Sequence, residues 1–130
     1  MVEQFTVLFV EDDNDVRVSV QQILESKGFR LLVARDGDEA LRLLAKNEVD
    51  ALFTDVVMPG MDGISLAKQA KRLKPELKVM FMTGYYSRGA EAGQLGTLLF
   101  KPIRAAPLVE ALRGLLGVAQ DGGTSDPVAC

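Results

Sequence analysis

Residues 49–63 read VDALFTDVVMPGMDG, a stretch in which an apolar run leads into a carboxylate. The run from Ala51 to Phe53 predicts a buried strand, yet Asp55 follows where the pattern still calls for burial. Burying a carboxylate without a partner is costly. Asp55 is therefore either a surface residue or part of a site, and the residues that end the other strands distinguish these two interpretations.

The stretch belongs to a series of short apolar runs that alternate with helical patterns. The runs are mostly continuous, as is typical of strands that are covered on both faces. They are Phe5–Val10, Arg30–Ala34, Val49–Thr54, Lys78–Thr83 and Thr97–Phe100. Strands that alternate with helices predict a parallel α/β sheet with right-handed crossovers.

Several of the helical patterns carry start or stop signals. Asp36 and Glu39 have the spacing of a capping box, and Asp62 precedes the third helical pattern. In the last helical pattern, Pro107 suits the first helical position and Gly117 suits the end. These signals predict where the helices begin and end.

One domain is expected for a chain of 130 residues, which is long enough to bury a core. With 48% hydrophobic and 25% charged residues, its composition is that of a globular protein. Residues 84–96 are Gly-rich and poorly periodic, so a fourth helix there is expected to be short or irregular. We assign residues 1–117 to the domain and expect the polar, turn-rich residues 118–130 to be a disordered tail.

Charge and residue content exclude several classes of function. The net charge of −3, from 15 basic and 18 acidic residues, disfavours nucleic-acid binding through a basic face. No apolar run approaches membrane-spanning length and the start lacks a basic signal-peptide region, so a cytoplasmic domain without a membrane partner is expected. Cys130 is the only cysteine and histidine is absent, which leaves oxygen as the expected ligand for any metal.

Polar side chains follow most of the predicted strands, at the point where each strand ends. Acids, a hydroxyl and an ammonium group are represented, by Glu11, Asp12, Asp55, Thr83 and Lys101. In parallel α/β sheets, ligands bind outside the carboxyl ends of the strands, where the strand order reverses. We therefore expect these groups to gather at one edge of the sheet.

Each of these residues also has an ordinary explanation when taken alone. The acidic run Glu11–Asp15 suits a helix N-terminus, and it lacks the glycine and distal glutamate of a calcium loop. Asp55 could be a helix cap, Thr83 an ordinary strand-end residue and Lys101 a surface lysine. Together the set is more specific, because the fold brings groups that are distant in sequence to one edge.

Phosphoryl transfer is the chemistry that uses the complete set. Clustered carboxylates repel each other, and Mg²⁺ relieves that repulsion at all-oxygen sites while bridging a carboxylate and a phosphate. A carboxylate such as Asp55 can attack phosphorus to form an acyl phosphate. Thr83 and Lys101 would contact the phosphoryl oxygens, while Glu11 and Asp12 would hold the cation.

Four motifs, in order along the chain, resemble the receiver domain of two-component response regulators, whose best-known single-domain example is the chemotaxis regulator. They are VLFVEDD, LFTDVVMPGMDG, VMFMTG and LFKPI, and the similarity spans residues 5–117. The resemblance implies a flavodoxin-like, doubly wound, five-stranded parallel sheet in the order 2-1-3-4-5, with helices on both faces. It also implies a phosphorylatable signalling switch rather than a turnover enzyme.

The resemblance implies that Asp55 accepts a phosphoryl group from a histidine kinase or a histidine phosphotransfer protein. In this family the reaction requires Mg²⁺ (or Mn²⁺). The acid-pair positions fall on Glu11 and Asp12, with Asp12 preferred as the direct ligand. Asp55 itself and the backbone carbonyl of Val57 complete the implied set of metal ligands.

Further positions correspond to phosphoryl contacts in the family. Thr83 takes the hydroxyl role, Lys101 takes the lysine role, and Gly84 offers its backbone amide. The bond before the proline that follows this lysine, here Lys101–Pro102, is usually cis in receivers. The resemblance leaves the output partner open, and it also leaves open whether the domain forms a homodimer.

The chain departs from the family pattern at several positions. Leu98 stands where many receivers have an aromatic switch residue, which calls the usual coupling between hydroxyl and aromatic ring into question. Tyr85, Tyr86 and the pair Leu98–Leu99 are closer to receivers attached to hybrid histidine kinases. Val57 and Tyr85 occupy positions that in this family influence access of the hydrolytic water. Both are bulky and at best weakly polar, so we expect slow autodephosphorylation.

Other functions share parts of this residue set. Haloacid-dehalogenase-type phosphatases use Asp, Mg²⁺, Thr or Ser and Lys, but they carry a DxD motif on the first strand that this chain lacks. A binding-only pseudo-receiver is never phosphorylated, but such forms lose an acid, the aspartate or the lysine, and all are present here. Dinucleotide binding is disfavoured because no GxGxxG motif follows the first strand.

Overall fold

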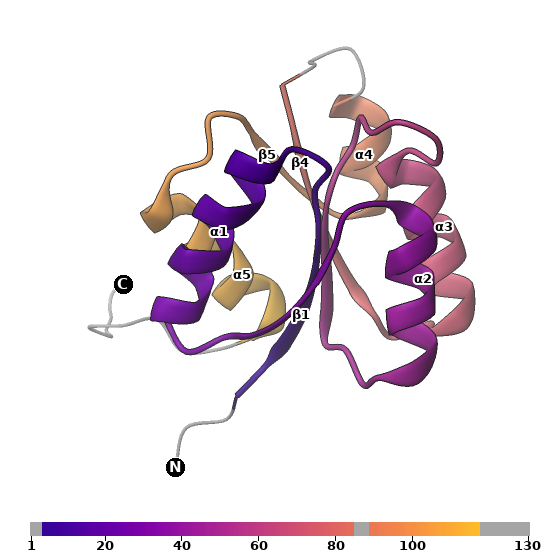
Figure 1. The fold of residues 1–130 in the computed structure, drawn as a ribbon, viewed down its shortest axis with the longest axis horizontal. Coiled ribbons are helices and arrows are strands. Elements are labelled where there is room, and N and C mark those ends of the chain that lie inside the picture. Colours follow the sequence, from indigo (N-terminus) through magenta and orange to yellow (C-terminus); the bar gives the residue numbers. More distant parts are fainter. Residues whose placement is uncertain (1–3, 85–88, 118–130) are drawn as a thin grey trace.

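Parallel strands alternate with helices throughout the residues that the computed structural model describes, 4–84 and 89–117 (Figure 1). The strands are β1 (Thr6–Val10), β2 (Arg30–Ala34), β3 (Ala51–Asp55), β4 (Lys78–Thr83) and β5 (Thr97–Phe100). The helices are α1 (Asn14–Ser26), α2 (Gly37–Lys46), α3 (Gly63–Leu73), α4 (Gly89–Leu95) and α5 (Ala105–Leu116). This alternation confirms the predicted α/β class.

The strands form one parallel sheet in the order β2-β1-β3-β4-β5, which confirms the implied topology. The chain runs from β1 outward to β2 on one side and from β3 outward to β4 on the other, so the strand order reverses between β1 and β3. Glu11 follows β1 and Asp55 ends β3, and both therefore lie at the reversal point. The topology alone selects this part of the edge as the place for a ligand.

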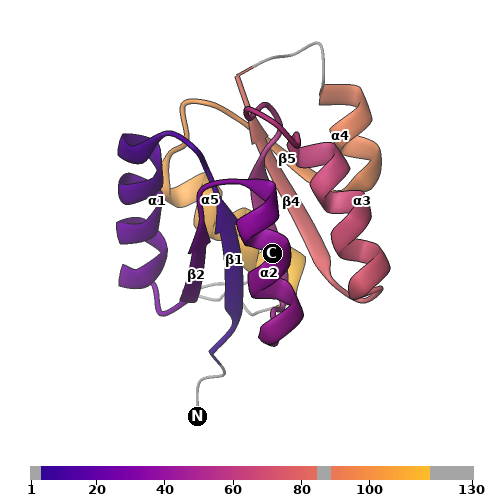
Figure 2. The ribbon, with the colours of Figure 1, turned by 45° about the vertical axis from the view of Figure 1, so that its right-hand side comes forward.

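Helices cover both faces of the sheet. α1 and α5 lie on one face, and α2, α3 and α4 lie on the other (Figures 1 and 2). Phe9 and Phe53 are buried on the α1–α5 side, where their rings stack with centroids 5.2 Å apart. Their strand neighbours Leu8 and Leu52 are buried on the opposite side. Burial on both faces explains why the strands read as continuous apolar runs.

Side-chain caps fix the starts of α1, α2 and α3. Oxygens of Asp13, Asp36 and Asp62 accept hydrogen bonds from first-turn amides of the three helices. The capping box predicted for α2 forms in part. Asp36 accepts from the N–H of Glu39 at 2.8 Å, whereas the Glu39 carboxylate accepts from the N–H of Arg35, outside the cap residue itself.

The start of α5 differs from the prediction. The helix begins at Ala105, after Arg104, so Pro107 is the third helical residue and not the first. Proline is tolerated there because the amides of the first turn have no partner within the helix in any case. Gly117 ends the helix as predicted, with a φ of 75° that favours glycine.

Strand boundaries also shift slightly from the prediction. β1 begins at Thr6 and β3 at Ala51, in each case later than the apolar run suggests. β3 continues through Asp55, because the N–H of Val56 donates to the carbonyl oxygen of Met82 at 2.9 Å and extends the pairing with β4. The backbone of Asp55 is therefore held within the sheet.

The fourth helix is short, as predicted. α4 has 7 residues, and Gly96 separates it from β5. A Cβ at Gly96 would lie 2.3 Å from the carbonyl oxygen of Val79, so only glycine lets the chain pass this close to β4. The helix ends where this close passage begins.

Some predictions concern parts of the chain that the structure does not describe. Tyr85 and Tyr86 lie outside the described residues, as does the expected tail at 118–130. The domain boundary at residue 117 therefore stays a prediction. Among the helices in the described ranges, none is long and apolar enough to cross a membrane.

Candidate functional site

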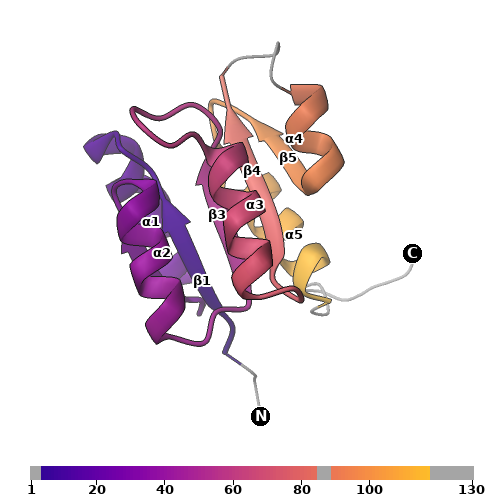
Figure 3. The same ribbon diagram turned by 90° about the vertical axis from the view of Figure 1, so that its right-hand side faces the viewer.

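The carboxyl ends of β1, β3, β4 and β5 lie at one edge of the sheet, where the loops after β1, β3 and β5 gather (Figure 3). This edge carries Glu11 directly after β1, Asp55 at the end of β3, Thr83 at the end of β4 and Lys101 directly after β5. The fold thus brings together residues that are far apart in the sequence, as the strand-end rule predicts.

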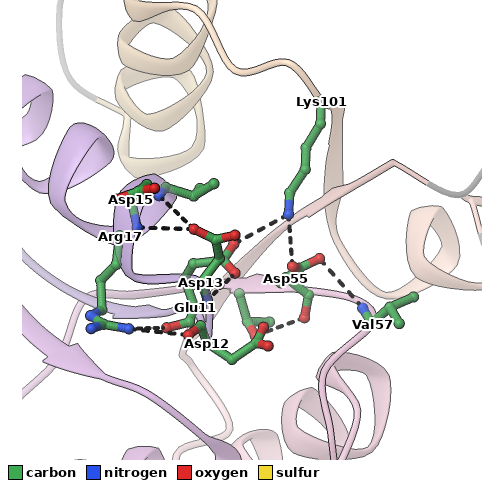
Figure 4. Close-up of polar contacts among 10 residues, drawn as sticks. Glu11, Asp12, Asp13, Asp15, Arg17, Asp55, Val57 and Lys101 are labelled. Carbon is green, nitrogen blue, oxygen red and sulfur yellow. Dashed lines mark hydrogen bonds and ion pairs between the residues drawn. The ribbon is translucent and has the colours of Figure 1, made fainter.

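Lys101 bridges the two buried carboxylates of the site. Its Nζ atom lies 2.8 Å from Asp55 Oδ2 and 3.3 Å from Glu11 Oε1 (Figure 4). Only 1% of Glu11 and 5% of Asp55 is exposed to solvent. Buried carboxylates require a partner of opposite charge, and Lys101 is a partner for both. Asp55 is therefore buried, which rules out the interpretation as a surface residue.

Glu11, Asp12 and Asp55 form a group that can hold a metal ion. One carboxylate oxygen from each residue lies within 4.8 Å of the others. Glu11 and Asp55 are buried whereas Asp12 is exposed, so solvent reaches the group from the side of Asp12. All donors are oxygens, which suits Mg²⁺, an ion that keeps several waters and binds few carboxylates. The residues therefore fit the cation that the sequence resemblance implies.

Burial and neighbouring groups together shift the pKa of Glu11. Burial is the main reason why the pKa of Glu11 is raised to about 7. The N–H of Asp13 donates to Glu11 Oε2 at 2.9 Å and lowers the pKa. The charge of Asp55 raises the pKa further, and Lys101 lowers it. Three carboxylates gather here, and the ammonium group of Lys101 contacts two of them, an arrangement that a divalent cation can stabilise.

The electrostatics of Lys101 are set by the same two acids. Partial burial acts to lower the pKa of Lys101, but the hydrogen bond to Asp55 and the charges of Asp55 and Glu11 raise it above its ordinary value. Lys101 is therefore a firmly protonated cation at neutral pH. Its ammonium group directly faces the carboxylate of Asp55.

Thr83, Gly84 and Val57 lie at the same edge. Thr83 is completely buried, and its carbonyl oxygen accepts from the N–H of Lys101 at 2.9 Å, while Gly84 follows it and is exposed. Val57 lies in the loop after β3, with its N–H 3.4 Å from Asp55 Oδ1 and its side chain 39% exposed. Their roles toward a phosphoryl group and a cation stay predictions.

The resemblance made two predictions about β5 and the loop after it, one for the Lys101–Pro102 peptide bond and one for Leu98. The Lys101–Pro102 peptide bond is cis, as the resemblance implied. Leu98, in the position of the aromatic switch, is partly buried and packs against the core on the side of α2, α3 and α4. This position holds no ring that could rotate.

Arg17 and Gly63 also shape the site. Arg17 lies outside the four motifs, and Gly63 ends the motif LFTDVVMPGMDG but had no role assigned to it. Arg17 of α1 donates to the backbone carbonyl oxygens of Glu11 and Asp12 (Figure 4). Gly63, the first residue of α3, lies against the backbone of Asp55, where a Cβ would be 2.0 Å from the Asp55 carbonyl oxygen. A basic residue near a helix start, where the macrodipole favours acids, was the one available signal for Arg17.

Comparison with known families decides the identity of the domain. Residues 7–113 match the response regulator receiver domain. The chain belongs to the receiver domain family. The matched range includes all of the acidic residues and the lysine of the site, and receivers of this family are components of two-component signalling systems.

Curated relatives of this receiver differ in length. The response regulator receiver protein CpdR of Brucella abortus (strain 2308) is 35% identical over 114 residues, which are 85% of this chain and 95% of CpdR. The sensor kinase CckA of the same organism is 34% identical over 117 residues, which are 85% of this chain and 12% of CckA. This receiver thus spans nearly all of CpdR and a small part of the sensor kinase.

Solved structures confirm the receiver fold. The receiver domain from the hybrid histidine kinase CckA has a TM-score of 0.76 and 37% identity, covering 85% of this chain and 98% of that one. A CheY-like receiver domain protein from Methanospirillum hungatei JF-1 has a TM-score of 0.82 and 26% identity, covering 88% of this chain and 95% of that one. The match to CckA confirms the predicted likeness to receivers of hybrid histidine kinases.

Proposed function

We propose that this receiver accepts a phosphoryl group on Asp55 from a histidine kinase or a histidine phosphotransfer protein, in a reaction that requires Mg²⁺ or Mn²⁺. Phosphorylation then changes its affinity for an output partner. The observation that carries the proposal is the position of Asp55, a buried carboxylate at the reversal point of the sheet. It contacts Lys101 at 2.8 Å and is grouped with Glu11 and Asp12.

The chemistry at Asp55 is nucleophilic substitution at phosphorus. A carboxylate oxygen of Asp55 attacks the phosphorus of a phosphohistidine, and the new O–P bond forms as the P–N bond breaks. The electron pair of the broken bond leaves with the imidazole, which takes up a proton. Lys101 is placed to shift its hydrogen bond from the carboxylate to the phosphoryl oxygens, and the Thr83 hydroxyl would donate to the same oxygens.

The cation belongs on the acidic side of the site. Glu11, Asp12, Asp55 and the carbonyl oxygen of Val57 would hold it, and when bound it offsets the charge of the carboxylates and of the phosphoryl group. The geometry supports this assignment, because three carboxylates converge there and Lys101 sets a single positive charge against two of them.

Intact-mass measurement after incubation with Mg²⁺ and a small phosphodonor tests the proposal. We expect one phosphoryl adduct on the wild type, none on Asp55→Asn, and none on the wild type when a chelator removes the metal. Asp50→Asn is the matched control, because Asp50 immediately precedes β3 and so lies at the opposite end of the strand. An adduct that persists on Asp55→Asn would contradict the assignment of the phosphoacceptor.

The alternatives predict different results in the same measurement. A binding-only pseudo-receiver would give no adduct on the wild type and would not bind Mg²⁺. The haloacid-dehalogenase interpretation has no support, because the chain belongs to the receiver family and lacks the DxD motif. A sensor kinase and a hybrid kinase among the relatives support a histidine kinase or phosphotransfer protein as the donor.

A further inference from the structure

We infer that Arg17 is a positioning residue for the cation site, because it holds the backbone on both sides of Asp12 and thereby sets the direction in which the Asp12 side chain leaves the backbone. The inference rests on the proposed function, since it concerns the same Mg²⁺ site. It assigns a role to a residue of α1 that does not itself offer a ligand atom.

The guanidinium of Arg17 folds back onto the loop between β1 and α1 (Figure 4). Its Nη1 donates to the carbonyl oxygen of Glu11 at 3.0 Å and to that of Asp12 at 3.4 Å. Its Nη2 donates to Asn14 Oδ1 at 2.6 Å. All three acceptors are neutral, so these contacts orient the loop and do not neutralise a carboxylate of the site.

The two carbonyl groups belong to the two peptide planes that flank the Cα atom of Asp12. Because peptide units are planar, the direction of the Glu11 carbonyl group depends on the φ angle of Asp12, and the direction of the Asp12 carbonyl group depends on its ψ angle. One guanidinium that holds both planes therefore fixes the direction of the Cα–Cβ bond of Asp12. Arginine suits this task because its guanidinium is rigid, so that Asn14, which holds Nη2, also fixes the position of Nη1.

Other bonds hold the neighbours of Asp12. The N–H of Glu11 donates to the carbonyl oxygen of Ala34 at 3.1 Å, and the N–H of Asp13 donates to the Glu11 carboxylate at 2.9 Å. Asp13 also caps α1 through its side chain. Asp12 itself is exposed, so packing does not orient it, and the contacts from Arg17 act on the part of the loop that packing leaves undetermined.

If Arg17 acted through its charge, its removal would change the Mg²⁺ affinity in the opposite direction to the change expected from a loss of positioning. A cation close to an acidic group repels Mg²⁺, so its removal would strengthen Mg²⁺ binding if charge dominated. Loss of a positioning contact instead weakens Mg²⁺ binding, because the Asp12 carboxylate then samples directions that do not face the other ligands. The direction of the change in affinity therefore separates the two roles.

The dependence of melting temperature on Mg²⁺ concentration, measured on the full chain, gives both stability and affinity. For Arg17→Ala we expect the half-saturating Mg²⁺ concentration to rise about tenfold, as found for outer-shell partners of metal ligands. Arg17→Lys should recover part of the affinity, because an ammonium group can donate to the same carbonyl oxygens but has no second nitrogen for Asn14 Oδ1 to hold in place. Arg42→Ala removes the same charge from an exposed position of α2 and should leave the affinity unchanged.

Two further readouts keep a structural effect separate from positioning. At saturating Mg²⁺, the rate of adduct formation from the small phosphodonor should return to the wild-type rate in Arg17→Ala. If Arg17→Ala melts too early for measurement, Asn14→Ala removes only the acceptor that orients the guanidinium, and it should raise the half-saturating concentration to a smaller extent. No rise in Asn14→Ala would then count against the inference.

The outcomes for the inference and for the proposed function are distinct. Mg²⁺ binding by Arg17→Ala that is as tight as in the wild type, or tighter, would overturn the positioning role and leave the proposed function intact. Absence of Mg²⁺ binding by the wild type would overturn both.

Discussion

The Cα atom of Gly63 lies directly against the carbonyl group of Asp55, so that a Cβ at Gly63 would come within 2.0 Å of the Asp55 carbonyl oxygen. The N–H of Gly63 also donates to the carbonyl oxygen of Val56 at 2.8 Å. The first residue of α3 thus closes the turn after the proposed phosphoacceptor through backbone contacts that only glycine allows.

Gly63→Ala should therefore affect both stability and phosphorylation. We expect the free energy of unfolding to fall by about 1–3 kcal/mol, because the added methyl group forces the backbones of β3 and α3 apart. The same displacement moves Asp55 relative to Lys101, so adduct formation should slow. Denaturant unfolding and intact-mass kinetics measure the two effects.

Gly114→Ala is the matched control for this prediction. Gly114 is exposed on α5, and a Cβ there would meet nothing within 4 Å. This variant should be as stable as the wild type or more stable, because alanine is the better helix former. If Gly63→Ala were as stable as the wild type, the close contact with Asp55 would not contribute to the free energy of unfolding.

The strand ends of this receiver were predictable from the sequence because burial leaves a direct signal. Strands that are covered on both faces give continuous apolar runs, and the residue after each run must lie at the edge of the sheet. Asp55 and Lys101 could therefore be placed together from the order of the strands and the residues that end them. Asp36 and Asp62 were predictable for a similar reason, since helix caps depend on residues close in sequence.

Contacts that depend on how a loop turns back onto the site left no comparable signal. Gly63 touches Asp55 only because α3 turns back onto β3, and Arg17 reaches its two carbonyl groups only because α1 starts beside the loop. Neither contact changes the hydrophobic periodicity. The prediction that Pro107 is the first helical residue was wrong, because proline is tolerated at more than one position in the first turn of a helix.

Lys101→Met should strengthen Mg²⁺ binding while it slows phosphorylation. Lys101 directly contacts oxygens of Glu11 and Asp55, so it competes with a cation for the same carboxylates. We expect the Mg²⁺ affinity to rise on the order of tenfold, because a charge a few ångströms away is worth more than 1 kcal/mol near a protein surface. Adduct formation should fall sharply, because the phosphoryl oxygens lose their ammonium partner.

The control for this variant is Lys68→Met, which removes a positive charge from an exposed position on α3. Its Mg²⁺ affinity and its rate of adduct formation should match those of the wild type. Weaker Mg²⁺ binding by Lys101→Met would show that Lys101 organises the carboxylates instead of competing for them. The expected contrast with Arg17→Ala follows from the acceptors: carboxylates for Lys101, backbone carbonyls for Arg17.

Mg²⁺ should stabilise the fold through the acidic group. A ligand that binds only the native state raises the free energy of unfolding by about 2.7 kcal/mol at one hundred times its dissociation constant. Asp12→Asn should lose most of this gain, because Asp12 is the member of the group that is open to solvent and accessible to a hydrated ion. Thermal unfolding with and without Mg²⁺ measures the difference.

Asp38→Asn supplies the control for charge in this experiment. Asp38 is an exposed acid in the first turn of α2 and is not a member of the acidic group. Its response to Mg²⁺ should equal that of the wild type, and addition of a chelator should return each protein to its metal-free melting temperature. An undiminished response in Asp12→Asn would remove Asp12 from the ligand set.

Val57 should make the acyl phosphate long-lived. Its backbone nitrogen lies 3.4 Å from Asp55 Oδ1 and the residue is 39% exposed, so the proposed phosphoacceptor has an apolar residue as its exposed neighbour here. A valine side chain neither accepts a proton from the attacking water nor orients it. We expect a half-life well above seconds for the phosphorylated wild type, followed by intact mass after removal of the donor.

Val57→Asn should shorten this half-life, because an amide can hydrogen-bond water close to the phosphoryl group. Val18→Asn is the matched control: Val18 is 43% exposed on α1, and the same substitution there should leave the half-life unchanged. A half-life of seconds or less in the wild type would contradict the assigned role. Equal half-lives for Val57→Asn and the wild type would show that access of water is limited elsewhere, and the side chain of Val57 would then be irrelevant to the lifetime of the switch.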